Sequence, residues 1–430
     1  MNLYENLIND LQNRSVDKSI IELLEKYPNV FSKQRNDIGE FKDFEHEIEL
    51  YRKQPIYWKP YKIPYAIEEE VENKISDMLK DGIIKECSSP WNSPLIPIRK
   101  KSGDLRLCVD YRRLNEITVK KVFPLPDHQQ IIDCLNGSRY FSTLDLSQGF
   151  YQIPLCSKDQ EKSSFTIKSG QYCFTRMPFG LTNSPCTFQR ALNNVMRKIN
   201  WRKCVIFMDD ILVFGKTIEE HNSNLEAVLK ILEKKNLKAM PTKCGILREE
   251  VSFLGHVINA HGVSTDPTKI ASMKEMIEPS NRKELQTFLG MCSYYRRFIK
   301  DFANISSPLY ELTSPKVKFE WKENHRKAFQ EMKEKMSSPP VLSFPNREDM
   351  FILYTDASDR AIGSVLCQLQ KDGEKVVAYA SRKLTKSEEN YSVTKKELLA
   401  IVNFIRHFKH YLWGVYFEVK TDHKSLEFML

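Results

Sequence analysis

The sequence contains no closely spaced cysteine pair of the kind that structural zinc sites and disulfide-rich folds use. Its ten cysteines come no closer together than Cys173 and Cys186, which indicates reduced thiols in an intracellular protein. No apolar run approaches the ~18 residues of a membrane span, so we expect no membrane partner. The 15 glycines and 20 prolines are too few for a collagen-like chain, and 41% hydrophobic residues exclude wholesale disorder.

What remains is the composition of an ordinary globular protein. Its 430 residues predict about two to four domains at roughly 100 to 200 residues each. The 65 basic residues exceed the 56 acidic ones by nine. This excess of positive charge favours a polyanionic partner, although it is smaller than the excess typical of a dedicated nucleic-acid-binding module.

Hydrophobic periodicity divides the chain into regions of different character. The regions are, in order, two short helices in residues 3–32, an extended proline-rich segment over 44–64, a helix over 68–80, alternating strands and helices from 83 to about 260, mostly helices over 265–340, and a strand, hairpin, helix and strand from 350 onward. This order predicts an α+β protein.

Two adjacent aspartates, Asp209 and Asp210, interrupt the apolar run from Cys204 to Phe214. Ionised carboxylates beside a core repel each other and lose hydration, so a cation normally compensates them. We expect a tight turn between two core strands, with the pair exposed at its tip; the alternative is an ordinary hairpin turn on a solvated edge. A third carboxylate, Asp145, lies in the similar run 140–150, and adjacent strands would bring all three together. Three converging aspartates are typical of a site that holds two Mg²⁺ ions for phosphoryl transfer.

The residues around these aspartates resemble motifs of a known family. The tetrapeptide Phe207-Met208-Asp209-Asp210 resembles the Y/F-x-D-D signature of reverse transcriptases, and residues 144–153 are similar to their first carboxylate motif. Further blocks agree in order: Trp91-Asn92-Ser93-Pro94, Leu107-Cys108-Val109-Asp110-Tyr111-Arg112-Arg113-Leu114-Asn115, Arg176-Met177-Pro178-Phe179-Gly180-Leu181, Ser184-Pro185 and Phe253-Leu254-Gly255-His256. From about residue 45 to its end, the chain resembles the reverse transcriptase/ribonuclease H region of a gypsy-type long-terminal-repeat retrotransposon Pol polyprotein.

The resemblance implies a right-hand polymerase with fingers, palm and thumb, followed by a truncated α/β ribonuclease H-like domain. The implied divisions are an N-terminal helical leader over 1–44, reverse transcriptase fingers and palm over 45–264, a thumb and connection over 265–345, and a ribonuclease H-like domain over 346–430 that is incomplete at its C-terminus.

The same resemblance assigns roles to residues of the polymerase part. It implies that Asp145, Asp209 and Asp210 are the catalytic metal ligands, with Leu146 adding its backbone carbonyl. Phe150 falls where the family places a bulky side chain against the sugar 2′ position, which would exclude ribonucleotides. Plain core packing is the alternative for Phe150.

Two further groups of residues are implied to bind substrate. Lys100 or Lys101 with Arg106 would hold the incoming triphosphate on a fingers hairpin, although a lysine-rich turn is more often just solvated. Leu254, Gly255 and His256 would form the primer grip. Phe179 stands where retroviral enzymes have Gln, and gypsy-type elements share the Phe. The basic helices after residue 265 would lie on an A-form-like duplex, unless they are only solvated faces.

A second carboxylate set follows in the last region. Asp356 comes after an apolar strand, Glu397 lies on a long amphipathic helix, and Asp422 ends a Val/Phe strand. These residues resemble the first three acidic ligands of the ribonuclease H fold, which hydrolyses a phosphodiester with two metals. The chain ends eight residues after Asp422, where the family continues with further helices and a fourth carboxylate. We therefore expect poor nuclease activity.

The chain has no Asp-Ser/Thr-Gly protease motif, integrase His/Cys cluster or Cys/His knuckle, so we expect a Pol fragment or a decayed or predicted gene. The expected function is RNA-directed DNA polymerase with a partial ribonuclease H. The rivals are an RNA-directed RNA polymerase, against which Phe150 argues, and a domesticated or decayed protein that binds nucleic acid without catalysis.

The resemblance also implies cofactors, partners and a location. The cofactor would be Mg²⁺, with Mn²⁺ as a substitute. The partners would be an RNA template, a DNA or tRNA primer, RNA–DNA hybrid and dNTPs, and a dimer is left open. The location would be a cytoplasmic virus-like particle, with the nucleus as an alternative.

Overall fold

The computed structural model describes residues 2–99 and 103–426, which form two compact units. Unit 1 comprises residues 1–131 and 138–249, and unit 2 comprises residues 132–137 and 250–430. Helices and mostly antiparallel sheets occur in both units, so the α+β prediction is confirmed. None of the described helices is both long and apolar enough to cross a bilayer.

The centre of unit 1 is a four-stranded antiparallel sheet in the order β7-β8-β4-β9. Its strands are β4 (Tyr140–Asp145), β7 (Cys204–Phe207), β8 (Asp210–Gly215) and β9 (Gly245–Arg248). Helices α6 (Ser184–Met196) and α7 (Ile218–Lys234) pack on it in one hydrophobic core. Helix α7 begins where the Thr217 hydroxyl accepts the Glu220 amide, and it buries Leu225, Val228, Leu229 and Leu232 at helical spacing.

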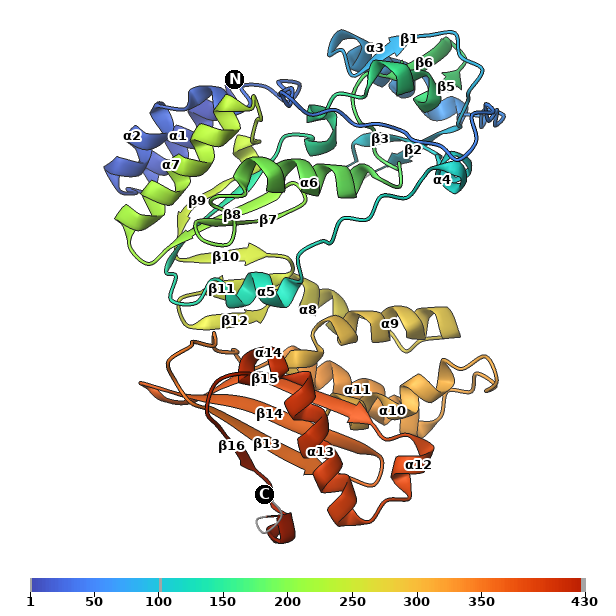
Figure 1. Ribbon diagram of the computed structural model, residues 1–430. Coiled ribbons are helices and arrows are strands. Elements are labelled where there is room, and N and C mark those ends of the chain that lie inside the picture. The colour runs from blue at the N-terminus through green and yellow to red at the C-terminus, as the bar shows by residue number, and fades with distance from the viewer. Residues whose placement is uncertain (1, 100–102, 427–430) are drawn as a thin grey trace. The chain divides into compact units, whose positions relative to one another are not determined.

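The N-terminal helices belong to this same core. Helices α1 (Leu3–Asn13) and α2 (Lys18–Glu25) bury Leu11, Ile20 and Leu24 completely, and Figure 1 shows α1 and α2 beside α7. Each such side chain contributes about 1.5–3 kcal/mol relative to exposure. The segment predicted as a leader is therefore built into the sheet's packing.

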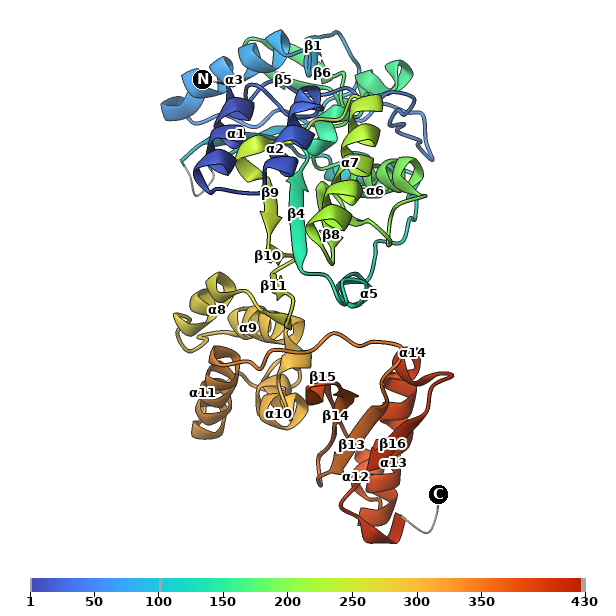
Figure 2. The same ribbon diagram turned by 90° about the vertical axis from the view of Figure 1, so that its left-hand side faces the viewer.

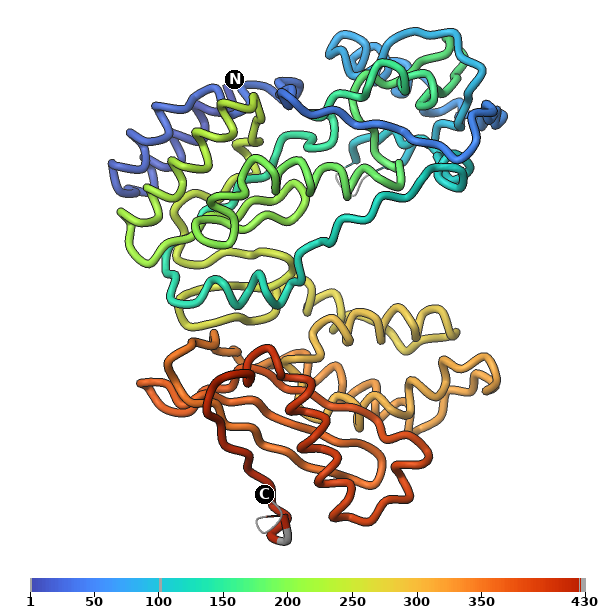
Figure 3. Tube along the Cα trace, in the orientation of Figure 1, coloured from blue at the N-terminus to red at the C-terminus, as the bar shows by residue number. Residues whose placement is uncertain are grey.

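A second core in unit 1 surrounds two smaller sheets. The strands are β1 (Ile84–Glu86), β6 (Gly170–Phe174) and β5 (Phe165–Ile167) in one sheet, and the hairpin β2 (Leu95–Arg99) and β3 (Leu105–Val109) in the other. Helix α3 (Glu68–Lys80) packs against β1 and β3 and has the predicted bounds. Figure 3 shows residues 44–64, in blue, as an extended chain across unit 1, as the prolines predict.

Unit 2 begins with a small antiparallel meander and a set of helices. The strands are β10 (Glu250–Phe253), β11 (His256–Asn259) and β12 (Gly262–Thr265), and the helices are α8 (Pro267–Lys274), α9 (Arg282–Tyr294), α10 (Phe302–Leu312) and α11 (Glu323–Ser337). The helices agree with the mostly helical prediction for 265–340. Strands β10 and β11 fall at the end of the region predicted as alternating strands and helices, whereas β12 was not predicted.

The last part of unit 2 is a sheet in the order β15-β14-β13-β16 with helix α13 (Val393–His407) packed on β13 and β14. Its strands are β13 (Phe351–Ala357), β14 (Ala361–Gln370), β15 (Gly373–Lys383) and β16 (Phe417–Lys420). Strand β16 pairs parallel with β13, and Figure 2 shows α13 along the strands. The predicted strand, hairpin, helix and strand are present.

Short helices complete the chain. They are α4 (Arg112–Ile117), α5 (His128–Asp133), α12 (Lys386–Glu389) and α14 (Lys409–Leu412). The predicted domain boundaries at residues 44, 264 and 345 remain predictions; the compact units change instead at residue 250, with 132–137 grouped with the later part.

Candidate functional site

The first carboxylate set lies around a tight hairpin in unit 1. Strands β7 and β8 pair Phe207 with Asp210, so Met208 and Asp209 form the turn. Met208 has a left-handed φ of 56°, and its amide donates to the Gln189 Oε1 atom at 2.7 Å. The turn therefore has the predicted form, but Asp209 and Asp210 are half-buried and not fully exposed.

Pairing of β4 with β8 brings the third aspartate into register. Asp145 and Asp210 lie directly opposite each other, and such residues have Cβ atoms about 4.5–5.5 Å apart. The Leu146 amide donates to the Asp209 carbonyl at 3.0 Å, which ties the end of β4 to the turn. The Leu146 carbonyl accepts the Gly149 amide at 3.2 Å and keeps a second lone pair for a cation.

Burial and the charge of neighbouring aspartates favour the protonated form of the Asp145 and Asp210 carboxyls. Burial, followed by Asp209 and Asp145, raises the pKa of Asp210 to about 6. Burial also raises the pKa of Asp145, while Lys243 opposes this shift. The Lys243 Nζ atom donates to both Asp145 carboxylate oxygens, at 3.0 and 3.1 Å. A bound cation would compensate the same negative charge.

Phe150 and Gly149 lie next to this hairpin in a 3₁₀ turn, Gly149–Gln152. The Phe150 ring packs between Phe179 and Phe188, with centroids 4.9 and 5.5 Å away. A Cβ atom on Gly149 would lie 3.0 Å from the Asp209 Cβ. Only glycine therefore lets this turn approach the aspartate so closely.

The expected triphosphate-binding residues are partly outside the described structure. Lys100 and Lys101 lie outside the described residues. Arg106 is exposed on β3, and its guanidinium carbon is 4.3 Å from the Phe179 ring centroid. The structure thus brings Arg106 and Phe150 to the same ring.

The expected primer grip is the two-residue turn between β10 and β11 in unit 2. Leu254 and Gly255 are both left-handed, with φ of 48° and 70°. The Tyr294 hydroxyl donates to the Leu254 carbonyl at 2.6 Å, and the Tyr295 hydroxyl donates to the Gly255 carbonyl at 2.7 Å. His256 is buried, and its Nδ1 atom lies 2.9 Å from the Leu254 carbonyl. Because leucine rarely adopts this conformation, these contacts hold a strained turn in place.

The second carboxylate set is more tightly gathered than the first. Asp356, Glu397 and Asp422 each place a carboxylate oxygen within 4.8 Å of the others. In the described part of the chain, no other group of three or more Asp, Glu, His or Cys residues is this compact. Glu397 is 3% exposed; its Oε1 accepts the Ala357 amide at 3.1 Å, and its Oε2 is buried without a hydrogen-bond partner.

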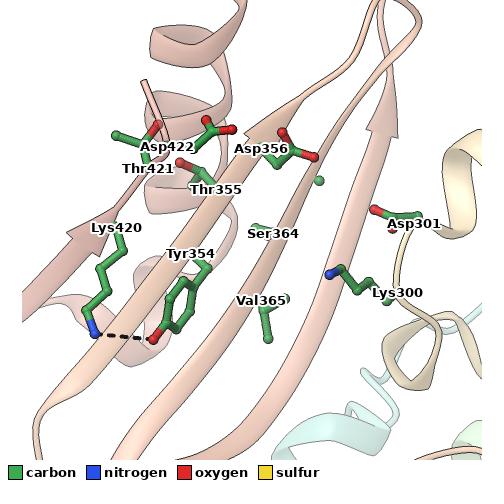
Figure 4. Close-up of a pocket in the computed structure, with 11 residues that line it drawn as sticks. Lys300, Asp301, Tyr354, Thr355, Asp356, Ser364, Val365, Lys420, Thr421 and Asp422 are labelled. Atoms are coloured by element: carbon green, nitrogen blue, oxygen red, sulfur yellow. Dashed lines mark hydrogen bonds between the residues drawn. The ribbon is translucent and has the colours of Figure 1, made fainter. Parts of the chain in front are cut away.

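The environment of Glu397 fits a metal ligand. Burial, followed by Asp422 and Asp356, raises its pKa to about 7. A buried carboxylate oxygen that lacks a donor is a position where a divalent cation would supply the missing interaction. Figure 4 shows Asp356 and Asp422 above a pocket that also contains Tyr354 and Lys420, whose side chains are hydrogen-bonded.

Some side chains at these sites carry no clear sequence signal. Lys243 reaches Asp145 only because β9 pairs with β4, a contact between residues 98 positions apart. The adjacent Tyr294 and Tyr295 could have been noticed as an aromatic pair at the end of a predicted helix. Their carbonyl partners lie 40 residues earlier and follow only from the folded structure.

Two family models match the chain. The model described as reverse transcriptase (RNA-dependent DNA polymerase) matches residues 98–258, and the RNase H-like domain found in reverse transcriptase matches residues 321–419.

Curated relatives cover almost the whole chain. It is 38% identical to the retrovirus-related Pol polyprotein from transposon opus of Drosophila melanogaster, over 95% of this chain and 42% of that protein. It is 36% identical to the corresponding polyprotein from transposon gypsy of the same organism, over 87% of this chain and 38% of that protein. The chain thus spans about two fifths of the length of these relatives.

Solved structures agree with these matches. The chain is similar to a foamy viral protease-reverse transcriptase in complex with dsDNA, with a TM-score of 0.88 and 27% identity over 99% of this chain and 90% of that one. A structure of the foamy viral protein with RNA/DNA hybrid matches with a TM-score of 0.82 and 27% identity, over 97% of this chain and 57% of that one. The predicted polymerase and ribonuclease H-like fold is confirmed.

Proposed function

We propose that this chain is an RNA-directed DNA polymerase, because a reverse transcriptase model matches residues 98–258, an RNase H-like model matches residues 321–419, and its relatives are Pol polyproteins of gypsy and other retrotransposons. It extends a primer with dNTPs on an RNA template. The observation that carries the proposal is the register of Asp145 opposite Asp210, beside a hairpin turn that contains Asp209.

Three carboxylates at one place suit phosphoryl transfer. Two bound Mg²⁺ ions, or Mn²⁺ as a substitute, would activate the primer 3′-hydroxyl and neutralise the triphosphate. Asp145, Asp209 and Asp210 would hold these ions, with the Leu146 carbonyl as a further oxygen ligand. The half-buried position of the aspartates limits competing water and strengthens their interaction with cations.

The surrounding residues bind and select the nucleotide. Arg106, together with Lys100 or Lys101, pairs with triphosphate oxygens through charge-assisted hydrogen bonds. Phe150 lies against the sugar and excludes a 2′-hydroxyl, and its packing with Phe179 and Phe188 fixes the ring. Leu254, Gly255 and His256 position the primer end through the backbone of their turn.

The RNase H-like domain provides a second candidate activity, hydrolysis of the RNA strand of a hybrid. The observation that favours it is the 4.8 Å cluster of Asp356, Glu397 and Asp422 with its unpaired buried oxygen.

The partners and the location of the protein are inferred from its relatives. We expect DNA or tRNA primers, RNA templates, RNA–DNA hybrid and dNTPs as partners, and an intracellular setting in a virus-like particle. Solved neighbours in complex with dsDNA and RNA/DNA hybrid support nucleic-acid partners.

Primer extension on two templates tests the polymerase assignment. Purified full-length protein with Mg²⁺ should incorporate dTTP on poly-rA at least as well as on poly-dA, and Asp210→Asn should remove both activities. Asp372→Asn, an exposed change on the β14–β15 turn, is the charge-matched control. Extension by Asp210→Asn at the control's rate would contradict the proposal.

A further inference from the structure

Strand β15 is one edge of the RNase H-like sheet, so part of its backbone faces away from the other strands. Two arginines from an earlier part of unit 2 bond this strand. The Arg296 Nη2 atom donates to the Ser381 carbonyl at 2.9 Å, and the Arg297 Nη2 atom donates to the Val377 carbonyl at 3.1 Å. Both arginines lie in the 3₁₀ turn Arg296–Phe298, before the region that the RNase H-like model matches. A segment outside the matched region is therefore bonded directly to the sheet.

A β-bulge in β15 frees the carbonyl that Arg297 bonds. The pairing of β14 with β15 shifts between Leu366 and Cys367, and Val377 is left out of the described register. The extra residue of a bulge does not take part in the ladder of hydrogen bonds. Val377 is completely buried, and a buried carbonyl needs a hydrogen-bond donor. Arg297 supplies such a donor, so the bulge and the arginine side chain fit each other.

The two residues immediately before these arginines hold the expected primer grip. Tyr294 and Tyr295 donate their hydroxyls to the carbonyls of Leu254 and Gly255. A Cβ atom on Gly255 would lie 3.1 Å from the Tyr295 hydroxyl oxygen, so the tyrosine is packed closely against the turn. The His256 ring adds to this contact, with its centroid 5.4 and 5.5 Å from the centroids of the two tyrosine rings. Four consecutive residues, 294–297, thus bond the Leu254-Gly255 turn with their first half and β15 with their second half.

A second connection joins the same meander to β15. Leu342 pairs with Val263 of β12: its amide donates to the Val263 carbonyl at 2.9 Å, and its carbonyl accepts the Val263 amide at 2.8 Å. The next amide, that of Ser343, donates to the Val376 carbonyl of β15 at 2.8 Å. Gly262 permits this approach, because a Cβ atom there would overlap the Leu342 carbonyl oxygen. The segment at 342–343 therefore bridges β12 and β15.

We propose that the RNase H-like sheet anchors the primer grip, and that Arg296 and Arg297 are positioning residues for primer extension. The inference rests on the proposed polymerase function, and it gives the sheet a role that does not require hydrolysis of RNA. The left-handed Leu254 strains the turn, and a strained turn keeps its shape only where its surroundings hold it. The two connections to β15 supply this support. A displacement of about 1 Å at a positioning group costs roughly 10²-fold in rate, so a loosened anchor should slow extension.

Hydrogen–deuterium exchange of the full chain tests the anchor without measuring activity. Arg296→Lys/Arg297→Lys keeps both positive charges but removes the guanidinium groups, so a changed attraction for nucleic-acid phosphates cannot explain an effect. We expect the amides of residues 250–258 to exchange at least tenfold faster than in wild type, while the β4 and β8 amides of unit 1 keep their rates.

A second variant and a matched control accompany this measurement. Ser343→Pro removes the amide that bonds β15 in the other connection, and it should also speed exchange in residues 250–258. Arg282→Lys is the control, because Arg282 donates to the Val317 carbonyl at 2.8 Å in the same unit, and Val317 is not part of β15. The control should exchange like wild type in residues 250–258.

Steady-state primer extension gives the functional readout. Arg296→Lys/Arg297→Lys should lower kcat at least fivefold and leave the KM for dNTP within twofold, because the expected dNTP-binding residues Arg106 and Phe150 belong to unit 1. A KM for dNTP that rises as much as kcat falls would indicate a general loss of structure and would overturn the inference.

The remaining outcomes separate the inference from the proposed function. If residues 250–258 exchange in Arg296→Lys/Arg297→Lys as they do in Arg282→Lys, the anchor is overturned and the polymerase proposal stands. Faster exchange with a kcat equal to that of the control also overturns the positioning role. If wild type itself does not extend primers, the proposed function fails, and the positioning role fails with it.

Discussion

Gly149 is the residue whose substitution most directly tests the packing around Asp209. A Cβ atom at this position would lie 3.0 Å from the Asp209 Cβ and 3.1 Å from the Phe188 Cζ. Non-bonded carbons prefer about 3.5–4.0 Å, so each contact is short by roughly 0.5–1 Å. Phe188 is completely buried and cannot retreat, whereas Asp209 lies on a half-exposed turn. Gly149→Ala should therefore displace Asp209.

The size of the effect follows from that displacement. Overpacking of this kind costs about 1–3 kcal/mol of stability. A shift of about 1 Å in a positioning group costs roughly 10²-fold in rate. We expect Gly149→Ala to fold with that loss of stability and to lower kcat for primer extension by about 10–100-fold, with a smaller change in the KM for dNTP.

Urea unfolding and steady-state primer extension measure both effects, and Gly290→Ala is the matched control. Gly290 lies within α9, and an added Cβ there would meet nothing within 4 Å. Glycine in a helix is less stable than alanine by about 0.5–1 kcal/mol, so the control should gain stability and keep its kcat. A Gly149→Ala protein with wild-type kcat would refute the tight contact between the turn and Asp209.

Three further predictions concern other parts of the chain. Phe150→Val should raise the ratio of kcat/KM for rNTP to kcat/KM for dNTP by about 10–100-fold, because an unpaired 2′-hydroxyl against the ring costs about 1–3 kcal/mol. An unchanged ratio would mean that Phe150 only packs in the core. Burial lowers the pKa of His46 to about 4, so the unfolded state binds more protons below pH 6.5 and stability falls as the pH drops from 6.5 to 4. The free energy of unfolding of wild type relative to His46→Gln should thus decrease by about 2–3 kcal/mol between pH 7.5 and 4.5, and a pH-independent difference would contradict this origin. Tyr294→Phe/Tyr295→Phe removes the two hydroxyls that hold the Leu254-Gly255 turn. The double variant should lose about 1–3 kcal/mol of stability and have a lower kcat, with little change in the KM for dNTP. A wild-type kcat would mean that the hydroxyls do not position the primer.

Local patterns were enough to predict the elements that carry the carboxylates. The apolar run broken by Asp209 and Asp210 required a turn between buried strands, and β7 and β8 have this arrangement. The order of strand, hairpin, helix and strand in the last sheet also followed from the apolar pattern. In both places a strong apolar pattern and the side-chain chemistry favour the same structure.

Contacts between distant segments could not be predicted in this way. The β10–β12 meander has short strands whose turn contains a left-handed leucine, a poor hairpin residue by local preference. Lys243 reaches Asp145 through tertiary packing alone. The predicted leader joins the sheet's core because apolar faces on α1 and α2 find a partner in α7, which periodicity does not identify.

Single-turnover incorporation of one dNTP by Asp145→Asn tests the central claim most directly, because Asp145 lies 64 residues from Asp209 and reaches it only through the β4–β8 pairing. An amide is a much poorer ligand for Mg²⁺ than a carboxylate. The account predicts a loss of at least about 10³-fold in the rate of the chemical step, about 4 kcal/mol, with the Kd for primer–template within about twofold of wild type. Incorporation by Asp145→Asn at the wild-type rate, with normal duplex binding, would contradict a metal centre shared by Asp145, Asp209 and Asp210.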